Sequence, residues 1–143
     1  MAATDSPLDL DATAQAALVR NGVVSPIELV DLALERIDAR NPALNAVIHR
    51  RDERARADAA AVDPSAPFAG VPMVLKDLMC ELADEPFHEG MHYLANIDYR
   101  APADQTLARR FKEAGFVIVG KTNTSELGGV PTTEPLRYGP THN

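Results

Sequence analysis

Two lysines in this 143-residue chain follow short apolar runs, where a lysine can take part in chemistry. Lys76 ends the run "GVPMVLK", and Lys121 stands within "GFVIVGKT", residues 115–122. A lysine kept away from water loses its proton more readily, because desolvation disfavours the ammonium form. The neutral amine can then accept a proton from a serine hydroxyl. A lone lysine at a strand end is also commonly a solvated charge, so the spacing alone leaves both interpretations of Lys76 open.

The stretch around Lys121 matches the letters of a phosphate-binding loop, G-x-x-x-x-G-K-[ST]. Such a loop needs its strand before the first glycine, and its own backbone must wrap around phosphates. Here residues 116–119 are Phe, Val, Ile and Val, which favour a strand. Gly115 is better explained as a helix stop. We therefore predict that the chain does not bind a nucleotide, and we expect Lys121 to be a surface charge or a support for a neighbouring site.

Helices are predicted in the first part of the chain. Asp11 can cap a helix that runs to Arg20, and "SPIE" at residues 25–28 is a capping box with proline in the first turn. We expect Asn41-Pro42 to end that second helix. Residues 51–61 form a third, with Ala55 and Ala59 facing inward, while residues 62–70 are a turn-rich connection.

The pattern then changes to that of an α/β protein. Residues 71–75 and 116–119 are compact apolar runs typical of buried strands, and a helix capped by Asp104 lies between them. This order favours parallel pairing of the two strands. Residues 80–102 are irregular and acidic, which predicts a long surface excursion. A further helix is expected near Asn123, and a loop after it.

Composition excludes several classes of protein. The formal net charge of −7 repels phosphate backbones, so direct binding to nucleic acid is not expected. No apolar run is long enough to span a membrane, and the polar N-terminus does not resemble a signal peptide. The single Cys80 cannot form an internal disulfide, which favours a reducing cytoplasm. The four histidines show no metal-binding spacing with Cys80, so no metal is expected.

Three segments together resemble the amidase signature family. They are "FAGVPMVLKDL" at 68–78, "ADQTLARRFKEAGFVIVGKTNTSEL" at 103–127 and "TTEPLRYGPTHN" at 132–143. The helical N-terminus is also similar, so the resemblance covers nearly the whole chain. The pieces resemble family members that act on cyclic and linear amides, and also the amidase component of glutamyl-tRNA amidotransferase.

The resemblance implies a fold and a mechanism. The expected fold is α/β: N-terminal helices (1–62) followed by the first strands of a mixed sheet (63–143), within one unit that is incomplete in this chain. The implied mechanism is amide hydrolysis by a Ser–cisSer–Lys triad with Lys76 as the lysine. The nucleophilic serine attacks the carbonyl, and backbone N–H groups hold the oxyanion. Neither a metal nor an organic cofactor is needed.

Other residues near these motifs have two interpretations each. Asp77 either supports the site or makes a turn. Thr122 and Asn123 follow a buried strand, where sites of α/β proteins gather, and either shape the pocket wall or cap a helix. Thr132 and Thr133 either face the site or form turns.

Both serines of the implied triad belong to a Gly/Ser-rich segment that these 143 residues do not include. The four serines present are Ser6, Ser25, Ser65 and Ser125, and none has such a context. We therefore expect the N-terminal portion of an amidase, inactive alone, which associates with itself or with the missing C-terminal part. A non-catalytic protein that pairs with a serine-bearing chain is the alternative.

Overall fold

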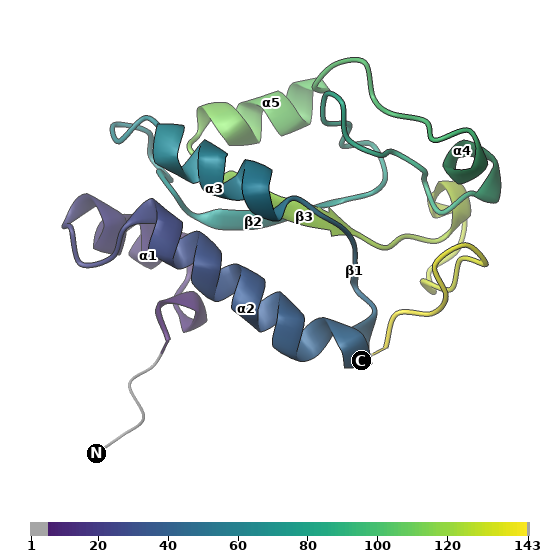
Figure 1. The fold of residues 1–143 in the computed structure, drawn as a ribbon, viewed down its shortest axis with the longest axis horizontal. Coiled ribbons are helices and arrows are strands. Elements are labelled where there is room, and N and C mark those ends of the chain that lie inside the picture. The colour runs from purple at the N-terminus through teal and green to yellow at the C-terminus, as the bar shows by residue number, and fades with distance from the viewer. Residues whose placement is uncertain (1–5, 143) are drawn as a thin grey trace.

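The computed structural model describes residues 6–142, and these form helices around a small three-stranded sheet (Figure 1). In chain order the elements are η1 (Pro7–Asp9), α1 (Ala12–Arg20), α2 (Pro26–Leu44), β1 (Val47–Arg50), α3 (Asp52–Ala61), β2 (Pro72–Lys76), α4 (His92–Asn96), α5 (Thr106–Glu113), β3 (Val117–Thr122) and η2 (Glu126–Gly128). The expected fold class, helices followed by strands of a mixed sheet, is confirmed.

The starts of the first two long helices follow from local capping. The Asp11 side chain accepts a hydrogen bond from the backbone N–H of Ala14, which is 2.8 Å away. The Ser25 hydroxyl accepts from the N–H of Glu28, whose carboxylate accepts in return from the N–H of Ser25. Both predicted caps are confirmed, because a cap depends only on residues close in sequence.

The prediction that Asn41-Pro42 ends α2 is wrong. The helix continues to Leu44 and ends where Asn45 takes a left-handed conformation at φ 49°. Pro42 lies in the last turn, so its missing N–H removes only one helical hydrogen bond. Asn41 also fixes the turn into β1, because its side-chain oxygen accepts from the N–H groups of Ala46 and Val47.

The sheet has the order β1–β3–β2. β2 pairs with β3 in parallel, as predicted, and Lys76 lies opposite Thr122. β1 pairs with β3 in the antiparallel direction. It comes from within residues 1–62, which were expected to be helical, and it links that part of the chain to the sheet. Among the described residues, β2 has no neighbour on its other edge.

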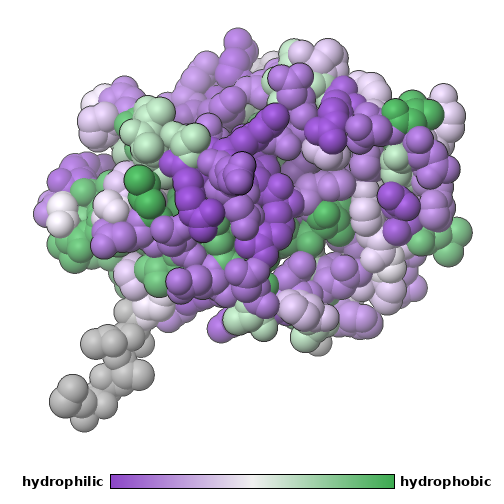
Figure 2. All heavy atoms as spheres, in the orientation of Figure 1, coloured by the Kyte–Doolittle hydropathy of each residue, from purple (hydrophilic) through white to green (hydrophobic). Residues whose placement is uncertain are grey.

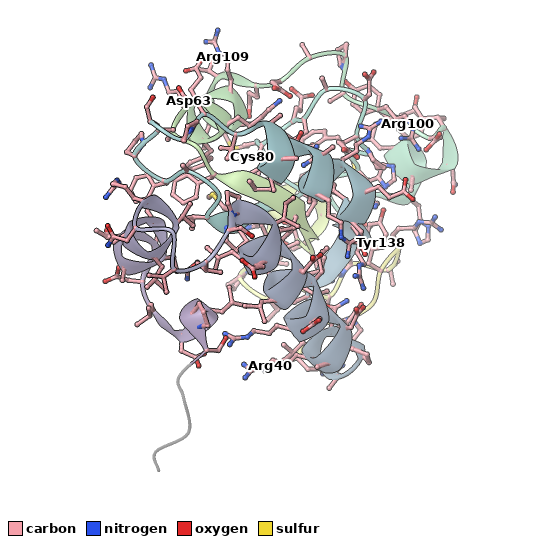
Figure 3. All side chains as sticks on the ribbon, turned by 60° about the vertical axis from the view of Figure 1, so that its left-hand side comes forward. Arg40, Asp63, Cys80, Arg100, Arg109 and Tyr138 are labelled. Carbon is pink, nitrogen blue, oxygen red and sulfur yellow. The ribbon has the colours of Figure 1, made fainter. Side chains whose placement is uncertain are left out.

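The sheet has packed side chains on both faces. Val117 and Val119 pack with buried residues of α2 and α3, namely Val30, Leu34, Ala55 and Ala59. Ile118 packs instead with Leu75, Cys80, Leu82 and Ala108. Because successive strand residues point to opposite faces, α2 and α3 cover one face while α5 and residues 80–82 cover the other. Cys80 accordingly lies in the interior, whereas Arg40, Asp63 and Arg109 lie at the periphery (Figure 3).

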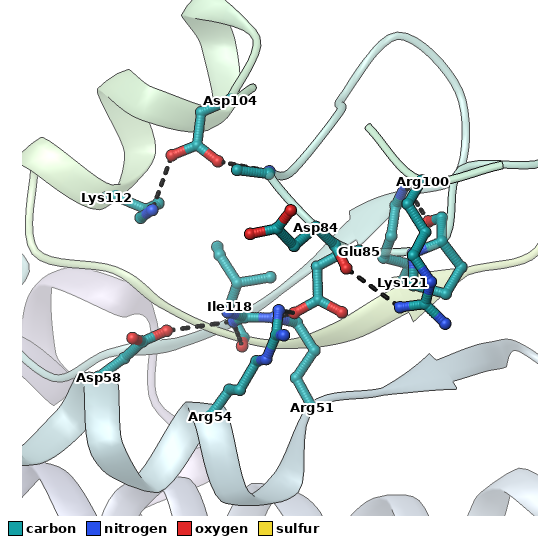
Figure 4. A network of polar contacts seen from close by, with 12 residues as sticks. Arg51, Arg54, Asp58, Asp84, Glu85, Arg100, Asp104, Lys112, Ile118 and Lys121 are labelled. Atoms are coloured by element: carbon teal, nitrogen blue, oxygen red, sulfur yellow. Dashed lines mark hydrogen bonds and ion pairs between the residues drawn. The ribbon is translucent and has the colours of Figure 1, made fainter. Parts of the chain in front are cut away.

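Residues 80–102 form the predicted surface excursion only in part, because residues 92–100 are mostly exposed while much of the rest is buried. Phe87, His88 and Ala101 are buried, and so is the carboxylate of Glu85. That carboxylate accepts from Arg51 at 2.5 Å and from Arg54 at 3.0 Å, which ties the segment to α3 (Figure 4). The acidic residues of the segment suggested solvent exposure, but the basic residues of α3 bind one of them.

Two predicted features near α5 and β3 also need correction. The cap residue of α5 is Gln105, and the Asp104 carboxylate instead accepts from the N–H of Ala83 and from Lys112 (Figure 4). After β3 only the short η2 forms among the described residues, and no α-helix starts at Asn123. Gly115 does end α5, with a left-handed φ of 96°.

The face of the molecule seen in Figure 2 is largely polar. In the view of Figure 2 most atoms belong to hydrophilic residues, with small hydrophobic patches between them. Within residues 6–142, no helix is long and apolar enough to cross a membrane.

Candidate functional site

The predicted site residues Lys76, Asp77, Thr122 and Asn123 meet where β2 and β3 end. Lys76 is the last residue of β2 and lies opposite Thr122 in the ladder. The N–H of Asp77 donates to the carbonyl of Thr122 at 2.9 Å, which continues the pairing one residue beyond the strand. The parallel arrangement therefore brings together residues that are far apart in sequence.

Lys76 is exposed within the described residues. Leu75 is buried, but Val74 is 38% exposed. Since strand residues alternate between faces, Val74 and Lys76 share the open face of β2. Within the part of the chain that the structure describes, Lys76 therefore has the solvated environment, which is one of its two interpretations.

The buried lysine of the site is Lys121. Its amine lies 2.8 Å from Oδ1 of Asp77, and both side chains are at most 1% exposed. The amine also donates to the carbonyl of Pro86 at 3.2 Å and lies 4.4 Å from the ring centre of Phe87. The surface interpretation of Lys121 is thus wrong, and Asp77 has a buried partner rather than a simple turn role. The sequence carried a signal for this ion pair: Asp77 directly follows one strand, β2, and Lys121 lies within the neighbouring strand, β3.

The match to a phosphate-binding loop is explained by the fold. Residues 117–122 form β3, and their backbone pairs with β1 on one side and β2 on the other. These backbone groups are committed to the sheet and do not wrap around a ligand.

Asn123 holds the C-terminal loop against the sheet. Its side-chain amide donates to the carbonyl of Gly139 at 3.0 Å and to the hydroxyl of Thr141 at 3.1 Å. Thr141 in turn donates its N–H to the carbonyl of Thr133. Thr133 is therefore linked to Asn123 through Thr141, whereas Thr132 is exposed.

A cluster of three rings lies beside this loop and had no counterpart among the predicted site residues. The Tyr138 hydroxyl lies between Nδ1 of His88 and Nε2 of His49. The two imidazole rings meet edge to face, with centroids 5.0 Å apart. The N–H of His88 donates to Oδ2 of Asp77 at 3.1 Å, so the cluster adjoins the buried ion pair. Figure 3 shows Tyr138 on the C-terminal loop.

Burial dominates the electrostatics of the cluster. It lowers the pKa of His49 from 6.5 to about 4, and it also lowers the pKa of His88. Burial likewise raises the pKa of Tyr138, and the charge of Asp77 adds to that effect. Near neutral pH the cluster is therefore made of two neutral imidazoles and a neutral phenol.

None of the four serines lies in a relay with Lys76. Ser6 and Ser25 cap helices, and Ser65 donates to Asp63 at 2.7 Å. The Ser125 hydroxyl donates to the carbonyl of Val130 at 3.0 Å.

Among the described residues no group of acidic, histidine or cysteine side chains could hold a metal ion. Cys80 is buried, and burial raises the pKa of its thiol, which disfavours a nucleophilic role.

Comparison with known proteins identifies the family. The profile of the family described as Amidase matches residues 28–143. The chain belongs to this family. It is 43% identical over 140 residues to the 6-aminohexanoate-cyclic-dimer hydrolase of Paenarthrobacter ureafaciens, covering 96% of this chain and 28% of the relative. It is also 38% identical to a glutamyl-tRNA(Gln) amidotransferase component from Salinispora tropica, over 90% of this chain and 27% of that one.

Solved structures give the same fold. The structure of 6-aminohexanoate cyclic dimer hydrolase complexed with substrate superposes with a TM-score of 0.89 at 42% identity. That match covers 94% of this amidase-family chain and 27% of the solved one. The 143 residues thus span little more than a quarter of the amidases that they resemble.

Proposed function

We propose that this chain is the lysine-bearing portion of an amidase that hydrolyses carboxamide C–N bonds. The observation that carries the proposal is the position of Lys76 at the carboxyl end of a parallel strand, in a chain of the Amidase family. Sites of α/β proteins gather at such strand ends. The substrate class we propose is a small linear or cyclic amide, and no metal or organic cofactor takes part.

In the proposed reaction the Lys76 amine is the base of a Ser–cisSer–Lys triad. It accepts a proton from a serine beside a cis peptide, and that serine accepts one from the nucleophilic serine. The nucleophile attacks the amide carbon, the C–N bond breaks, and the amine leaves with a proton. Water then cleaves the acyl ester, which releases the acid and restores the serine.

Both serines of this triad would come from outside residues 1–143. Ser6 and Ser25 are committed to helix caps, and Ser65 and Ser125 donate their hydroxyl protons elsewhere. The described residues also leave Lys76 exposed. The same serine-bearing portion would cover Lys76, exclude water from it and supply the nucleophile. These 143 residues alone are then inactive.

The remaining predicted residues have supporting roles in this proposal. Asp77 fixes the end of β2 through its bonds to Thr122 and Lys121. Asn123 holds the loop that carries Thr132 and Thr133, which would form part of the pocket wall. We also propose a cytoplasmic location, since Cys80 is free and buried.

The test joins or mixes this chain with the remaining portion of the cyclic-dimer hydrolase, in which this proposal places both serines. We expect hydrolysis of a simple aryl amide by the assembly and none by either part. Lys76→Met should abolish it, whereas Lys112→Met, on the outer side of α5, should retain it. Hydrolysis by the 143 residues alone that disappears with Lys76→Ala would contradict the proposal.

The alternative is a non-catalytic protein that associates with a serine-bearing chain, as in a glutamyl-tRNA amidotransferase. A groove of about 360 Å³ favours association with another chain, both for an amidase portion and for a non-catalytic protein. Its walls include Ile37 and Leu44 of α2 and Met73 and Val74 of β2, and β2 has an unpaired edge in the described part of the chain. Apolar grooves and free strand edges are typical of surfaces that another chain or another part of the domain covers. Binding without turnover in the mixing experiment would support this alternative, and so would self-association of the chain through the groove.

A further inference from the structure

We infer that Lys121 is a positioning residue for Lys76. The inference rests on the proposed function, because it gives Lys121 a part in placing the proposed base. Lys121 is on β3 and Lys76 is on β2, and Asp77 connects them: it follows Lys76 directly in the chain and its carboxylate binds the Lys121 amine at 2.8 Å.

The geometry joins three segments at one buried amine. Lys121 belongs to β3, Asp77 belongs to the end of β2, and the carbonyl of Pro86 belongs to the segment after it. The carboxylate of Asp77 is also bound by the N–H of His88, and its own N–H is bound to Thr122. Asp77 is therefore held by Thr122 and Lys121 of β3 and by the N–H of His88.

Burial makes this connection rigid. Lys121 is 1% exposed and Asp77 is fully buried, so water cannot replace either partner. Removing one member of a buried pair leaves an uncompensated charge, which is strongly unfavourable. By contrast Lys76 is exposed, and its backbone pairs with β3, but its amine makes no ion pair or hydrogen bond within the described structure. The direction from which its amine leaves the strand is then set by the backbone that Asp77 fixes.

A fixed direction matters for a base that must meet a serine. A displacement of about 1 Å of a reacting group costs about 100-fold in rate. The amine of Lys121 binds Asp77 and the carbonyl of Pro86, so its contribution in this inference is to hold the strand end in one place.

The first test uses the 143-residue chain and measures backbone ¹⁵N order parameters. In the wild type we expect an order parameter of about 0.85 at Lys76 and Asp77, as in rigid backbone. In Lys121→Met we expect the order parameters of both residues to fall below about 0.6. Lys112→Met is the matched control, since Lys112 also binds a carboxylate, that of Asp104 at 2.7 Å, but on the outer side of α5. It should leave both values unchanged.

A double variant separates positioning from folding. Asp77→Asn with Lys121→Met removes both charges while keeping an acceptor for the N–H of His88, so the fold survives even where Lys121→Met alone does not. We expect the double variant to unfold in urea as the wild type does, while its backbone at Lys76 is mobile. An order parameter at Lys76 equal to that of Lys112→Met would overturn the inference.

The second test uses the assembly with the serine-bearing portion. The double variant should lower kcat about 100-fold with KM unchanged, because the strand end positions the base and does not bind substrate. Full activity of the folded double variant would also overturn the inference. An inactive wild-type assembly would argue against the proposed function, while the order parameters would still decide whether Lys121 fixes the strand end.

Discussion

The hydroxyl of Tyr138 lies 3.2 Å from Nε2 of His49, and this contact joins the C-terminal loop to β1. Tyr138 also contacts His88, so one phenol bridges two histidines. Their centroids are only 5.0 Å apart, and charging both rings would place two cations side by side in a buried site. The contact therefore makes the stability of the chain depend on pH.

We expect the free energy of unfolding to fall as the pH is lowered from about 6.5 to about 4. Burial lowers the pKa of His49 from 6.5 to about 4, so the unfolded chain binds its proton first. Above pH 6.5 this histidine is neutral in both states and has no effect, and below about pH 4 its effect is constant. The lowered pKa of His88 acts in the same direction.

Urea unfolding at a series of pH values would measure this dependence. His49→Gln should flatten the curve over that window, while His92→Gln, at an exposed position, should leave it unchanged. A curve for His49→Gln that is as steep as that of the wild type would contradict the prediction.

Arg51→Met should destabilise the chain by about 3–5 kcal/mol, because it leaves the Glu85 carboxylate buried with one partner fewer. Arg51 is only 8% exposed, and it also donates to the carbonyl of Ile118 in β3. Arg54→Met is the control, since Arg54 binds the same carboxylate from an exposed position and should cost about 1 kcal/mol or less. Similar unfolding midpoints in urea for the two variants would show that the buried arginine is not essential.

Gly120→Ala should disrupt the pairing of β1 with β3. A Cβ at Gly120 would lie 2.6 Å from the carbonyl oxygen of His49, and backbone atoms cannot easily move away. We expect a loss of about 1–3 kcal/mol. Gly129→Ala is matched to it, because its nearest contact would be 3.4 Å and neither glycine has a positive φ. Thermal unfolding compares the two, and an equal midpoint for both would refute the prediction.

Ser25→Ala should cost about 0.5–2 kcal/mol through loss of the capping bond to Glu28. Ser65→Ala removes a hydroxyl of similar exposure that caps no helix, and it should have little effect. Circular dichroism during urea unfolding would record the difference. A stability equal to that of the wild type in Ser25→Ala would mean that the capping box does not determine where α2 begins.

How much of this structure could be predicted depended on how far apart the partners are in the sequence. The caps at Asp11 and Ser25 were predictable because their hydrogen bonds reach only three residues along the chain. The parallel pairing of β2 and β3 followed from the order of the elements. The end of α2 was mispredicted because Asn41 and Asn45, rather than Pro42, determine it.

The burial of polar residues could not be predicted from partners close in sequence or from the order of the elements. Lys121 is buried because Asp77 and the segment at Pro86 surround it, and these lie more than thirty residues away. Glu85 is buried because Arg51, the residue before α3, binds it. Lys76 was correctly placed at a strand end, but its exposure reflects which face of β2 the described residues leave uncovered.

The order of the strands in the sheet has a consequence for synthesis of the chain. The central strand, β3, is the last of the three to be made, and it is the only strand with which either neighbour pairs within the described structure. As the polypeptide leaves the ribosome, β1 and β2 must therefore wait without partners until Thr122 has emerged. Non-local pairing of this kind is slow, and an apolar segment such as residues 71–75 is open to aggregation during the delay.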